Sequence, residues 1–594
     1  MSAKTFKIQI KGRVQGVGFR PFVFKLAQQL NINGCVSNDA EGVIVKMTTS
    51  TEKAIIFLET VLKNPPPVSI ISNHKFEEVS TQTFKDFSIV ASATNQKINI
   101  PLTPDFAICN ECKKEIKDVE NRRYGYPFTT CVNCGPRYAI TTRFPFERVH
   151  TSLSNFEMCT TCETEYKDPS NRRFHSQTNG CNDCGIRLEL VEADDSKVTI
   201  DKQKILQKTA ELIAEGRIIA IKNTNGYVLC CDATNPEVIE QLRQKKKRPN
   251  KAFAVLYDTI ESVQKDFQLT GQEEELLTST VAPIVILENT KETRIATKII
   301  APSLNQTGVL LPSSSLLELL MDVVKSPIVC TSGNIHGSPI ISENEVAQSE
   351  LREIADYFVH HNLPIQFPQD DSVVKIVEGK EIILRRSRGY APNYLTDYIQ
   401  NTSGILAMGA HLKSTFSLVP NAHIYVSQYF GNLNSYDVSE RYEKTINQQL
   451  NVFNCMPKTV LIDAHPTYQS SIIGNKLARK WNAELVEIQH HKAHFASVLG
   501  EYELFDSEER VLGVVWDGTG YGDDNAIWGG EFFTYENHKI ERVSHFEYYD
   551  WLANDKMAQE PRIALLSLLE EKNRCYIKDK FSEIEFDLYT KLLR

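Results

Sequence analysis

The sequence predicts a multidomain protein of mixed α/β and α+β class, with two small metal-binding modules between its larger domains. With 594 residues, the chain is too long to fold around one hydrophobic core. Eight of its 14 cysteines form C-x2-C pairs, a pattern typical of metal sites rather than of disulfides. On the C-terminal side, predicted helices alternate with short apolar runs, which is typical of α/β domains.

The composition narrows the possible surroundings and partners of the protein. Hydrophobic residues make up 41% and charged residues 24%, as in ordinary globular proteins. The net charge of −9 gives no reason to expect a nucleic-acid partner. No apolar run is long enough for a membrane span, and the N-terminus lacks the apolar core of a signal peptide. We therefore expect a cytoplasmic protein that binds neither membranes nor nucleic acids.

Residues 1–92 are predicted to form a small domain in the order β-α-β-β-α-β. The apolar pattern predicts strands and helical stripes in the order Phe6–Val14, Pro21–Leu30, Gly34–Asp39, Gly42–Met47 and Thr51–Leu62. A proline run then ends the second helix before the last strands. This order predicts a split βαβ sandwich.

The end of the first predicted strand carries a candidate phosphate site. Gly16 and Gly18 allow the backbone to approach a ligand closely, and the N–H groups at a helix start suit a phosphate. Arg20 can hold a phosphoryl group with its forked guanidinium. Asn38, at the end of a later strand, can orient an attacking water. The alternative is a plain glycine turn beside a surface arginine.

Residues 100–190 contain an internal repeat of 50 residues with two C-x2-C-x18-C-x2-C modules, at 109–134 and 159–184. Four thiolates complete a tetrahedral zinc site and leave no open position for water, so we expect two structural zinc ions. The predicted ligands are Cys109, Cys112, Cys131, Cys134, Cys159, Cys162, Cys181 and Cys184. His150 and His175 break the repeat, and we expect them to lie in the second shell or at the surface.

Residues 200–395 are predicted to form an α/β domain with an anion site. A dense basic run over 245–251 follows an amphipathic helix and precedes an apolar strand. In an acidic protein, this run favours a local site for ATP or carbamate over a solvated face. Thr331–Asn334 places hydroxyl and amide groups at the end of a strand, where α/β sites gather.

A second α/β segment, 402–594, contains a candidate metal and nucleotide site. His490 and His494 are four residues apart, so on a helix both imidazoles face the same way. Asp517 ends an apolar strand before a glycine turn that phosphates can approach. The alternative is a helix pair of histidines and a plain turn.

The order of these parts resembles the HypF family of carbamoyltransferases, which mature nickel–iron hydrogenases, and the resemblance extends over the whole chain. It implies a ferredoxin-like acylphosphatase domain, two four-cysteine zinc modules, a YrdC-like domain and a TsaD-like ASKHA domain. It also implies catalytic roles for Arg20 and Asn38 in hydrolysing carbamoyl phosphate. The carbamoyl group would then pass through carbamate and carbamoyl adenylate to the C-terminal cysteine of the partner protein HypE.

The resemblance also implies ligand sets for ATP with Mg²⁺ and for a divalent metal, iron or zinc. The nucleotide ligands in the YrdC-like domain would be Lys246, Arg248, Lys251, Ser332, Asn334 and Ser372. The ASKHA metal ligands would be His490, His494 and Asp517, followed by a phosphate loop of Gly518, Thr519 and Gly520.

The sequence also departs from the family pattern. Ala282, Leu363 and Pro368 stand where the family has arginines, and the resemblance predicts further residues after Arg594. We therefore expect a divergent member that is truncated in its ASKHA domain. Two alternatives remain open: a degenerate paralogue that binds partners through its zinc modules, and a related O- or threonylcarbamoyl transferase.

Overall fold

The computed structural model describes residues 4–39, 42–90, 101–290, 292–394, 403–421, 423–553 and 555–593. The chain divides into two compact units. The first comprises Met1–Leu406 and His411–Pro457, and the second comprises Ala407–Ala410 and Lys458–Arg594. The domain boundaries predicted from the sequence, 1–92, 100–190, 200–395 and 402–594, stay predictions.

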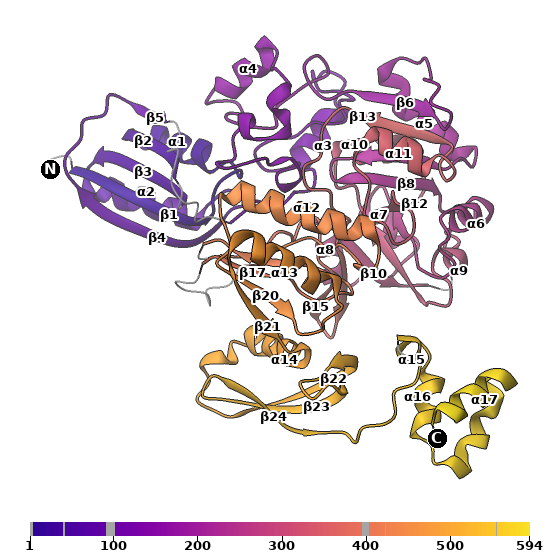
Figure 1. The fold of residues 1–594 in the computed structure, drawn as a ribbon. Helices are drawn as coiled ribbons and strands as arrows, with labels where there is room; N and C mark the ends of the chain where they lie inside the picture. The colour runs from indigo at the N-terminus through magenta and orange to yellow at the C-terminus, as the bar shows by residue number, and fades with distance from the viewer. Residues whose placement is uncertain are drawn as a thin grey trace. The chain divides into compact units, whose positions relative to one another are not determined.

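The N-terminal domain is a five-stranded sheet with strand order β4-β1-β3-β2-β5 and two helices (Figure 1). Its elements are β1 (Lys4–Arg13), α1 (Phe19–Gln29), β2 (Asn33–Asp39), β3 (Gly42–Thr49), α2 (Thr51–Lys63), β4 (Ile70–Val79) and β5 (Phe87–Ile89). Alternate residues of β1 and β3, such as Ile8 and its partner Val45, are buried beneath the helices. The predicted order β-α-β-β-α-β is confirmed, with one further short strand.

The cysteine-rich region has little regular structure and repeats its few elements. Helix α3 (Asn110–Lys117) starts directly after Cys109, and α4 (Thr160–Lys167) starts directly after Cys159. Three short 3-10 turns, η1 (Tyr138–Ile140), η2 (Arg148–His150) and η3 (Ser152–Asn155), connect the two modules. The 50-residue sequence repeat is therefore also a structural repeat.

The next domain contains a ten-stranded mixed sheet in the order β15-β14-β10-β11-β9-β12-β8-β7-β13-β6. The strands are β6 (Leu188–Glu192), β7 (Ile219–Asn223), β8 (Gly226–Asp232), β9 (Ala254–Leu256), β10 (Ile284–Glu288), β11 (Gln306–Leu310), β12 (Ile328–Ser332), β13 (Tyr357–His361), β14 (Val373–Val377) and β15 (Lys380–Arg385). The helices are α5 (Ile205–Ala214), α6 (Pro236–Lys245), α7 (Ile260–Gln264), α8 (Gly271–Thr278), α9 (Thr297–Ile300), α10 (Ser315–Val324) and α11 (Asn344–Leu351). Apolar cores lie on both faces of the sheet, as expected for an α/β domain.

The remainder of the first unit includes β16 (Asn393–Tyr394), β18 (Ser417–Val419), β19 (Ile424–Val426) and the long helix α12 (Tyr436–Phe453). Strand β17 (Ile405–Ala407) lies at the boundary between the two units.

The second unit begins with an α/β segment and continues into an antiparallel sheet. Its elements are β20 (Thr459–Asp463), α13 (Gln469–Trp481), β21 (Glu484–Ile488), α14 (His490–Glu501), η5 (Leu504–Asp506), β22 (Val511–Tyr521), β23 (Ile527–Glu536), β24 (Lys539–His545), α15 (Asp555–Gln559), α16 (Pro561–Leu568), η6 (Glu571–Lys580) and α17 (Glu583–Leu592). Strands β20 and β21 are parallel, whereas β22, β23 and β24 pair antiparallel.

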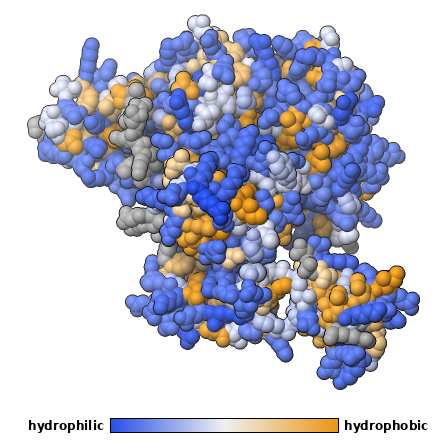
Figure 2. All heavy atoms as spheres, in the orientation of Figure 1, coloured by the Kyte–Doolittle hydropathy of each residue, from blue (hydrophilic) through white to orange (hydrophobic). Residues whose placement is uncertain are grey.

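Figure 2 shows apolar side chains on the surface of the C-terminal helices, where Leu568, Ile584 and Leu592 are exposed. Among the residues that the structure describes, no helix combines the length and the apolar character needed to cross a membrane.

Candidate functional site

Arg20 and Asn38 come together in the N-terminal domain. Arg20 lies in the first turn of α1, and Asn38 is the last residue but one of β2. With the side-chain amide of Asn38 oriented to suit its neighbours, its oxygen accepts from Nε and Nη2 of Arg20, each at 3.3 Å. Burial lowers the pKa of Arg20 below its ordinary value, while Glu147, 3.7 Å away, acts in the opposite direction. The arrangement is a buried cation beside an amide that can orient water.

The glycine loop before Arg20 packs against the zinc region. Gly18 has a φ of 74°, and a Cβ atom there would come within 2.8 Å of Val132. Arg137 ties the two regions together, because its Nε donates to the carbonyl of Gly16 at 2.7 Å. The two terminal nitrogens of the same guanidinium donate to the backbone carbonyls of Cys131, Val132, Cys134 and Pro136. The glycine loop is thus fastened to the Cys131–Cys134 turn.

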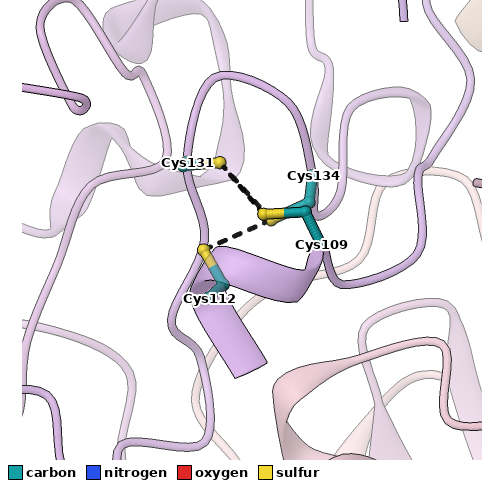
Figure 3. Close-up of side chains that lie close together, drawn as sticks. All are labelled: Cys109, Cys112, Cys131 and Cys134. Atoms are coloured by element: carbon teal, nitrogen blue, oxygen red, sulfur yellow. Dashed lines mark hydrogen bonds between the residues drawn. The ribbon is translucent and has the colours of Figure 1, made fainter. Parts of the chain in front are cut away.

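The two cysteine clusters have the geometry of tetrahedral zinc sites. In the first, Cys109–Cys131, Cys131–Cys134 and Cys112–Cys134 have Sγ–Sγ distances of 3.6, 3.7 and 3.6 Å (Figure 3). The matching distances in the second cluster are 3.8, 3.8 and 3.6 Å. Zn–S bonds of about 2.3 Å in a tetrahedron require about 3.8 Å between sulfurs. The four thiolates of each cluster therefore fit a structural zinc ion.

Each module supplies cations to the cysteines of the other module. Arg122 of the first module lies 3.4 Å from Cys162 and 3.7 Å from Cys159. Arg172, its counterpart in the second module, lies 3.5 Å from both Cys109 and Cys112.

Glutamates hold these arginines in place. Arg122 pairs with Glu165 at 3.0 Å, and Arg172 pairs with Glu115 at 2.8 Å. A zinc ion with four thiolates carries two net negative charges. The guanidinium groups offset this negative charge, which lies among buried and half-buried cysteines. The two modules thus stabilise each other.

The ten-stranded sheet carries a cavity of about 270 Å³ that is rich in cations. Arg248 and Lys251, both predicted nucleotide ligands, line it together with Ser332 at the end of β12. Arg385 and Asp370 also line it. Burial, followed by the charge of Arg385, lowers the pKa of Arg248 to about 10, so this side chain remains charged at neutral pH. The cavity is suited to a phosphate-containing ligand.

The other predicted nucleotide ligands lie behind the wall of this cavity. Lys246 is buried, and its Nζ donates to the carbonyls of Ser332 and Asn334, both at 2.6 Å. The Asn334 side chain accepts from Lys246 at 2.8 Å. Ser372 is buried and donates to the carbonyl of Arg388 at 2.8 Å. These three residues hold the loops that shape the cavity. Arg385 was not among the predicted ligands, although Arg386 and Arg388 follow it closely in the sequence.

His490, His494 and Asp517 come together in the second unit. Their ligand atoms lie within 4.8 Å of one another, and Nε2 of His490 is 3.2 Å from both His494 Nε2 and Asp517 Oδ2. Asp463, at the end of β20, binds Nδ1 of His490 at 2.7 Å and so orients the ring. Together with Asp517 it raises the pKa of His490 to about 9. Two imidazoles, a carboxylate and a second-shell carboxylate fit a divalent metal ion. The sequence did not predict that Asp463 would orient the ring of His490.

The glycine segment after Asp517 differs from the turn expected from the sequence. Gly518, Thr519 and Gly520 lie inside β22, where the pairing with β23 shifts between Trp516 and Gly520. A Cβ atom at Gly520 would come within 2.2 Å of His491, whereas one at Gly518 would meet nothing within 4 Å. The strand therefore bulges here because the histidine helix α14 packs closely against it, and open space remains beside Gly518.

Sequence profiles of known families match consecutive parts of the chain. An acylphosphatase profile matches residues 6–89, and a HypF finger profile matches 108–141 and 158–191. A profile described as telomere recombination, of the Sua5, YciO and YrdC type, matches 211–387. The HypF Kae1-like domain and the second subdomain of the carbamoyltransferase Kae1-like domain match 400–501 and 513–590.

Whole-chain comparisons agree with this order. The carbamoyltransferase HypF of Synechocystis is 42% identical over 95% of this chain, which covers 73% of that protein. A probable carbamoyltransferase HypF of Methanocaldococcus jannaschii is 39% identical over the same share. A crystal structure of full-length HypF in the phosphate- and nucleotide-bound form has a TM-score of 0.92 at 36% identity, and the match covers 77% of that chain.

A much shorter protein matches the N-terminal domain alone. An acylphosphatase of Pseudothermotoga lettingae is 42% identical over 84 residues, which are 93% of that protein. The predicted fold class, and an enzymatic rather than a purely binding function, are confirmed by these comparisons. The chain belongs to the HypF family of carbamoyltransferases.

Proposed function

We propose that this carbamoyltransferase uses carbamoyl phosphate and ATP to carbamoylate the C-terminal cysteine of HypE in the cytoplasm. Three sites would act in sequence: the Arg20 and Asn38 pair, the cation-lined cavity of the ten-stranded sheet, and the His490, His494 and Asp517 group. The contact between Arg20 and Asn38 carries the proposal, because it places a phosphate-binding cation beside an amide that can position water.

The first step is hydrolysis of carbamoyl phosphate. Arg20 and the backbone N–H groups of the glycine loop bind the phosphoryl oxygens, and Asn38 holds a water in line with the phosphorus. The water oxygen bonds to phosphorus as the bond from phosphorus to the bridging oxygen breaks. The products are inorganic phosphate and carbamate, which keeps the bridging oxygen.

The second step is adenylation. A carbamate oxygen attacks the α-phosphorus of ATP, and pyrophosphate leaves, which gives carbamoyl adenylate. Arg248, Lys251 and Arg385 line the cavity and would offset the charge of the phosphates, with Mg²⁺ bound to the nucleotide. Lys246 would keep Ser332 and Asn334 in position for the ligand.

The third step is transfer to sulfur. The cysteine thiolate of HypE attacks the carbamoyl carbon, the carbon–oxygen bond to the adenylate breaks, and AMP leaves. His490, His494 and Asp517 would hold a divalent iron or zinc ion, which supplies Lewis-acid stabilisation of the negative charge. Asp463 fixes the ring of His490, and the open space beside Gly518 leaves room for the phosphate of the adenylate.

Pyrophosphate release from ATP by the whole chain tests the proposal. We expect release that depends on carbamoyl phosphate, that Arg20→Ala abolishes, and that added carbamate restores in Arg20→Ala. Lys25→Ala, a change on the same helix, serves as the control and should leave release unchanged. The absence of carbamoyl-phosphate-dependent release by the unmodified chain would overturn the proposal.

A further inference from the structure

The second zinc module forms part of the wall of the Arg20 and Asn38 site. A small cavity of about 30 Å³ adjoins these two residues. The lining of this cavity includes the consecutive residues His175, Ser176 and Gln177. The acylphosphatase that matches 84 residues of the N-terminal domain consists almost entirely of that domain and has no room for such a wall. The zinc module therefore supplies side chains that the acylphosphatase fold alone does not have.

The internal repeat shows that this wall is a departure from the common template. The offset of 50 residues aligns His175 and Ser176 with Gly125 and Tyr126. Gly125 has a φ of 65° and His175 a φ of 53°, so both loops use the left-handed conformation. Glycine adopts this conformation freely, whereas a histidine is strained in it. A strained side chain that faces a cavity is typical of a functional position.

Two polar atoms of residues in the cavity wall are buried and have no hydrogen-bond partner among the residues that the structure describes. They are Oγ of Ser176 and Oε1 of Gln15. The amide of Gln15 is held in place because its Nε2 donates to the carbonyls of Asp39 and Gly42, both at 2.8 Å. The Oε1 atom of Gln15 is thus the part of the amide that remains without a partner among the described residues. Leaving buried acceptors unpaired is costly, so a ligand that donates hydrogen bonds would be favoured here.

The neighbouring charges fit a ligand that has a phosphoryl group and, away from it, a neutral polar group. Arg20 lines the same cavity and offers a cation that can hold a phosphoryl group. Burial and the charge of Arg20 lower the pKa of His175 to about 4, so its imidazole is neutral at physiological pH. The side chains that the second zinc module places in the wall are therefore uncharged but polar. Arg137, the other cation in the lining, donates its guanidinium hydrogen bonds to backbone carbonyls.

We propose that Ser176 and Gln15 form the acyl-group end of this site, where their oxygens accept hydrogen bonds from the amino group of a carbamoyl phosphate. The inference rests on the proposed hydrolysis at Arg20 and Asn38, and it makes Ser176 a specificity-determining residue supplied by the zinc module. Acetyl phosphate has nearly the same shape, but its methyl group cannot donate. A site with buried acceptors discriminates against such an analogue because those acceptors stay unpaired.

The test compares kcat/KM for carbamoyl phosphate and acetyl phosphate, measured as phosphate release by the whole zinc-loaded chain. Ser176→Ala removes an unpartnered hydroxyl, and we expect it to lower the ratio of carbamoyl to acetyl phosphate kcat/KM by about three- to tenfold, as for one lost hydrogen bond. Ser154→Ala, an exposed serine outside the cavity lining, should leave the ratio unchanged. Zinc content is measured in each variant to establish that the module is intact.

The outcomes separate the inference from the function on which it rests. A ratio in Ser176→Ala equal to that of the unmodified chain, at the same zinc content, would overturn the role of Ser176. Arg20→Ala should lower hydrolysis of both substrates together. If the unmodified chain hydrolysed neither substrate, the proposed first step and the specificity built on it would both be wrong.

Discussion

The two zinc modules share one template, but the loops that follow their paired arginines contact different domains. Their sulfur geometry and crossed arginines are nearly identical, yet the loop after the paired arginines differs. In the first module, Tyr126 and Phe128 pack into the core of the ten-stranded sheet. In the second, His175 and Ser176 line the cavity beside Arg20. The two metal sites therefore share one geometry, while the loop after the paired arginines contacts a different domain in each module.

The modules also differ in how deeply their cysteines are buried. In the first, Cys112, Cys131 and Cys134 are buried and Cys109 is half-buried. In the second, both Cys159 and Cys184 are half-buried. The first zinc site belongs to the packed interior, whereas the second lies nearer to solvent. This difference makes the contribution of each site to stability measurable.

Removal of a ligand should have the largest effect. Cys134→Ala should abolish the soluble folded protein, because structural zinc contributes on the order of 10 kcal/mol to folding and this site sits in the interior. Cys184→Ala, its counterpart in the second module, should lower the zinc content by one ion per chain and leave the protein folded. Zinc analysis and soluble yield measure both effects. Equal losses of yield in the two variants would show that the modules do not differ in this way.

Replacement of either crossed arginine by alanine should have the next largest effect. Arg172→Ala should speed chelator extraction of zinc from the first module by about 10- to 100-fold, the equivalent of a charge-assisted hydrogen bond of about 1.5–3 kcal/mol. Arg122→Ala should do the same to the second module. Cysteine alkylation and mass spectrometry identify which module is released. Faster release from the module that carries the substitution would contradict the crossed arrangement.

Chelation of the unmodified protein gives a smaller effect. Zinc should leave the second module first, because two of its four cysteines are half-exposed. Alkylation during a slow chelator titration should therefore label Cys159 and Cys184 before Cys131 and Cys134. Labelling in the reverse order would show that burial does not govern release.

Substitution in the variable loop should have the smallest effect. His175→Gly gives the second module the glycine of the first, and relief of the left-handed strain should raise the free energy of unfolding by about 1 kcal/mol. Gly125→Ala should lower it by a similar amount, since no neighbour crowds that position and only the backbone responds. Thermal unfolding of both variants measures these two changes in stability. A destabilised His175→Gly would mean that its ring contacts outweigh the strain.

The site residues that are set by local sequence could be predicted, whereas those that depend on contacts between distant segments could not. The cysteine spacing and the His490 and His494 pair define their sites within one turn or helix, so the sequence was sufficient. Arg137 and Asp463 were missed because each acts on a partner brought close only by folding. His175 lines the Arg20 cavity, half-buried, and this position follows from packing between domains.

The comparisons decide between the function hypotheses that the sequence left open. The 42% identity to a HypF carbamoyltransferase over 95% of the chain favours an enzyme of that family over a threonylcarbamoyl transferase or a binding protein. Ala282, Leu363 and Pro368 are not among the residues that line the cavity, and Arg248, Lys251 and Arg385 make that cavity cationic.

The single side chain of Arg137 bonds to both the glycine loop and the Cys131–Cys134 turn. Residues 6–89 fold in the pattern of an independent acylphosphatase, but the site they contain is completed from outside that range. The smallest inheritable unit of this chemistry is thus the N-terminal domain together with both metal modules. Recombination that joined this domain to a foreign finger region would preserve the fold and lose the fit of the site.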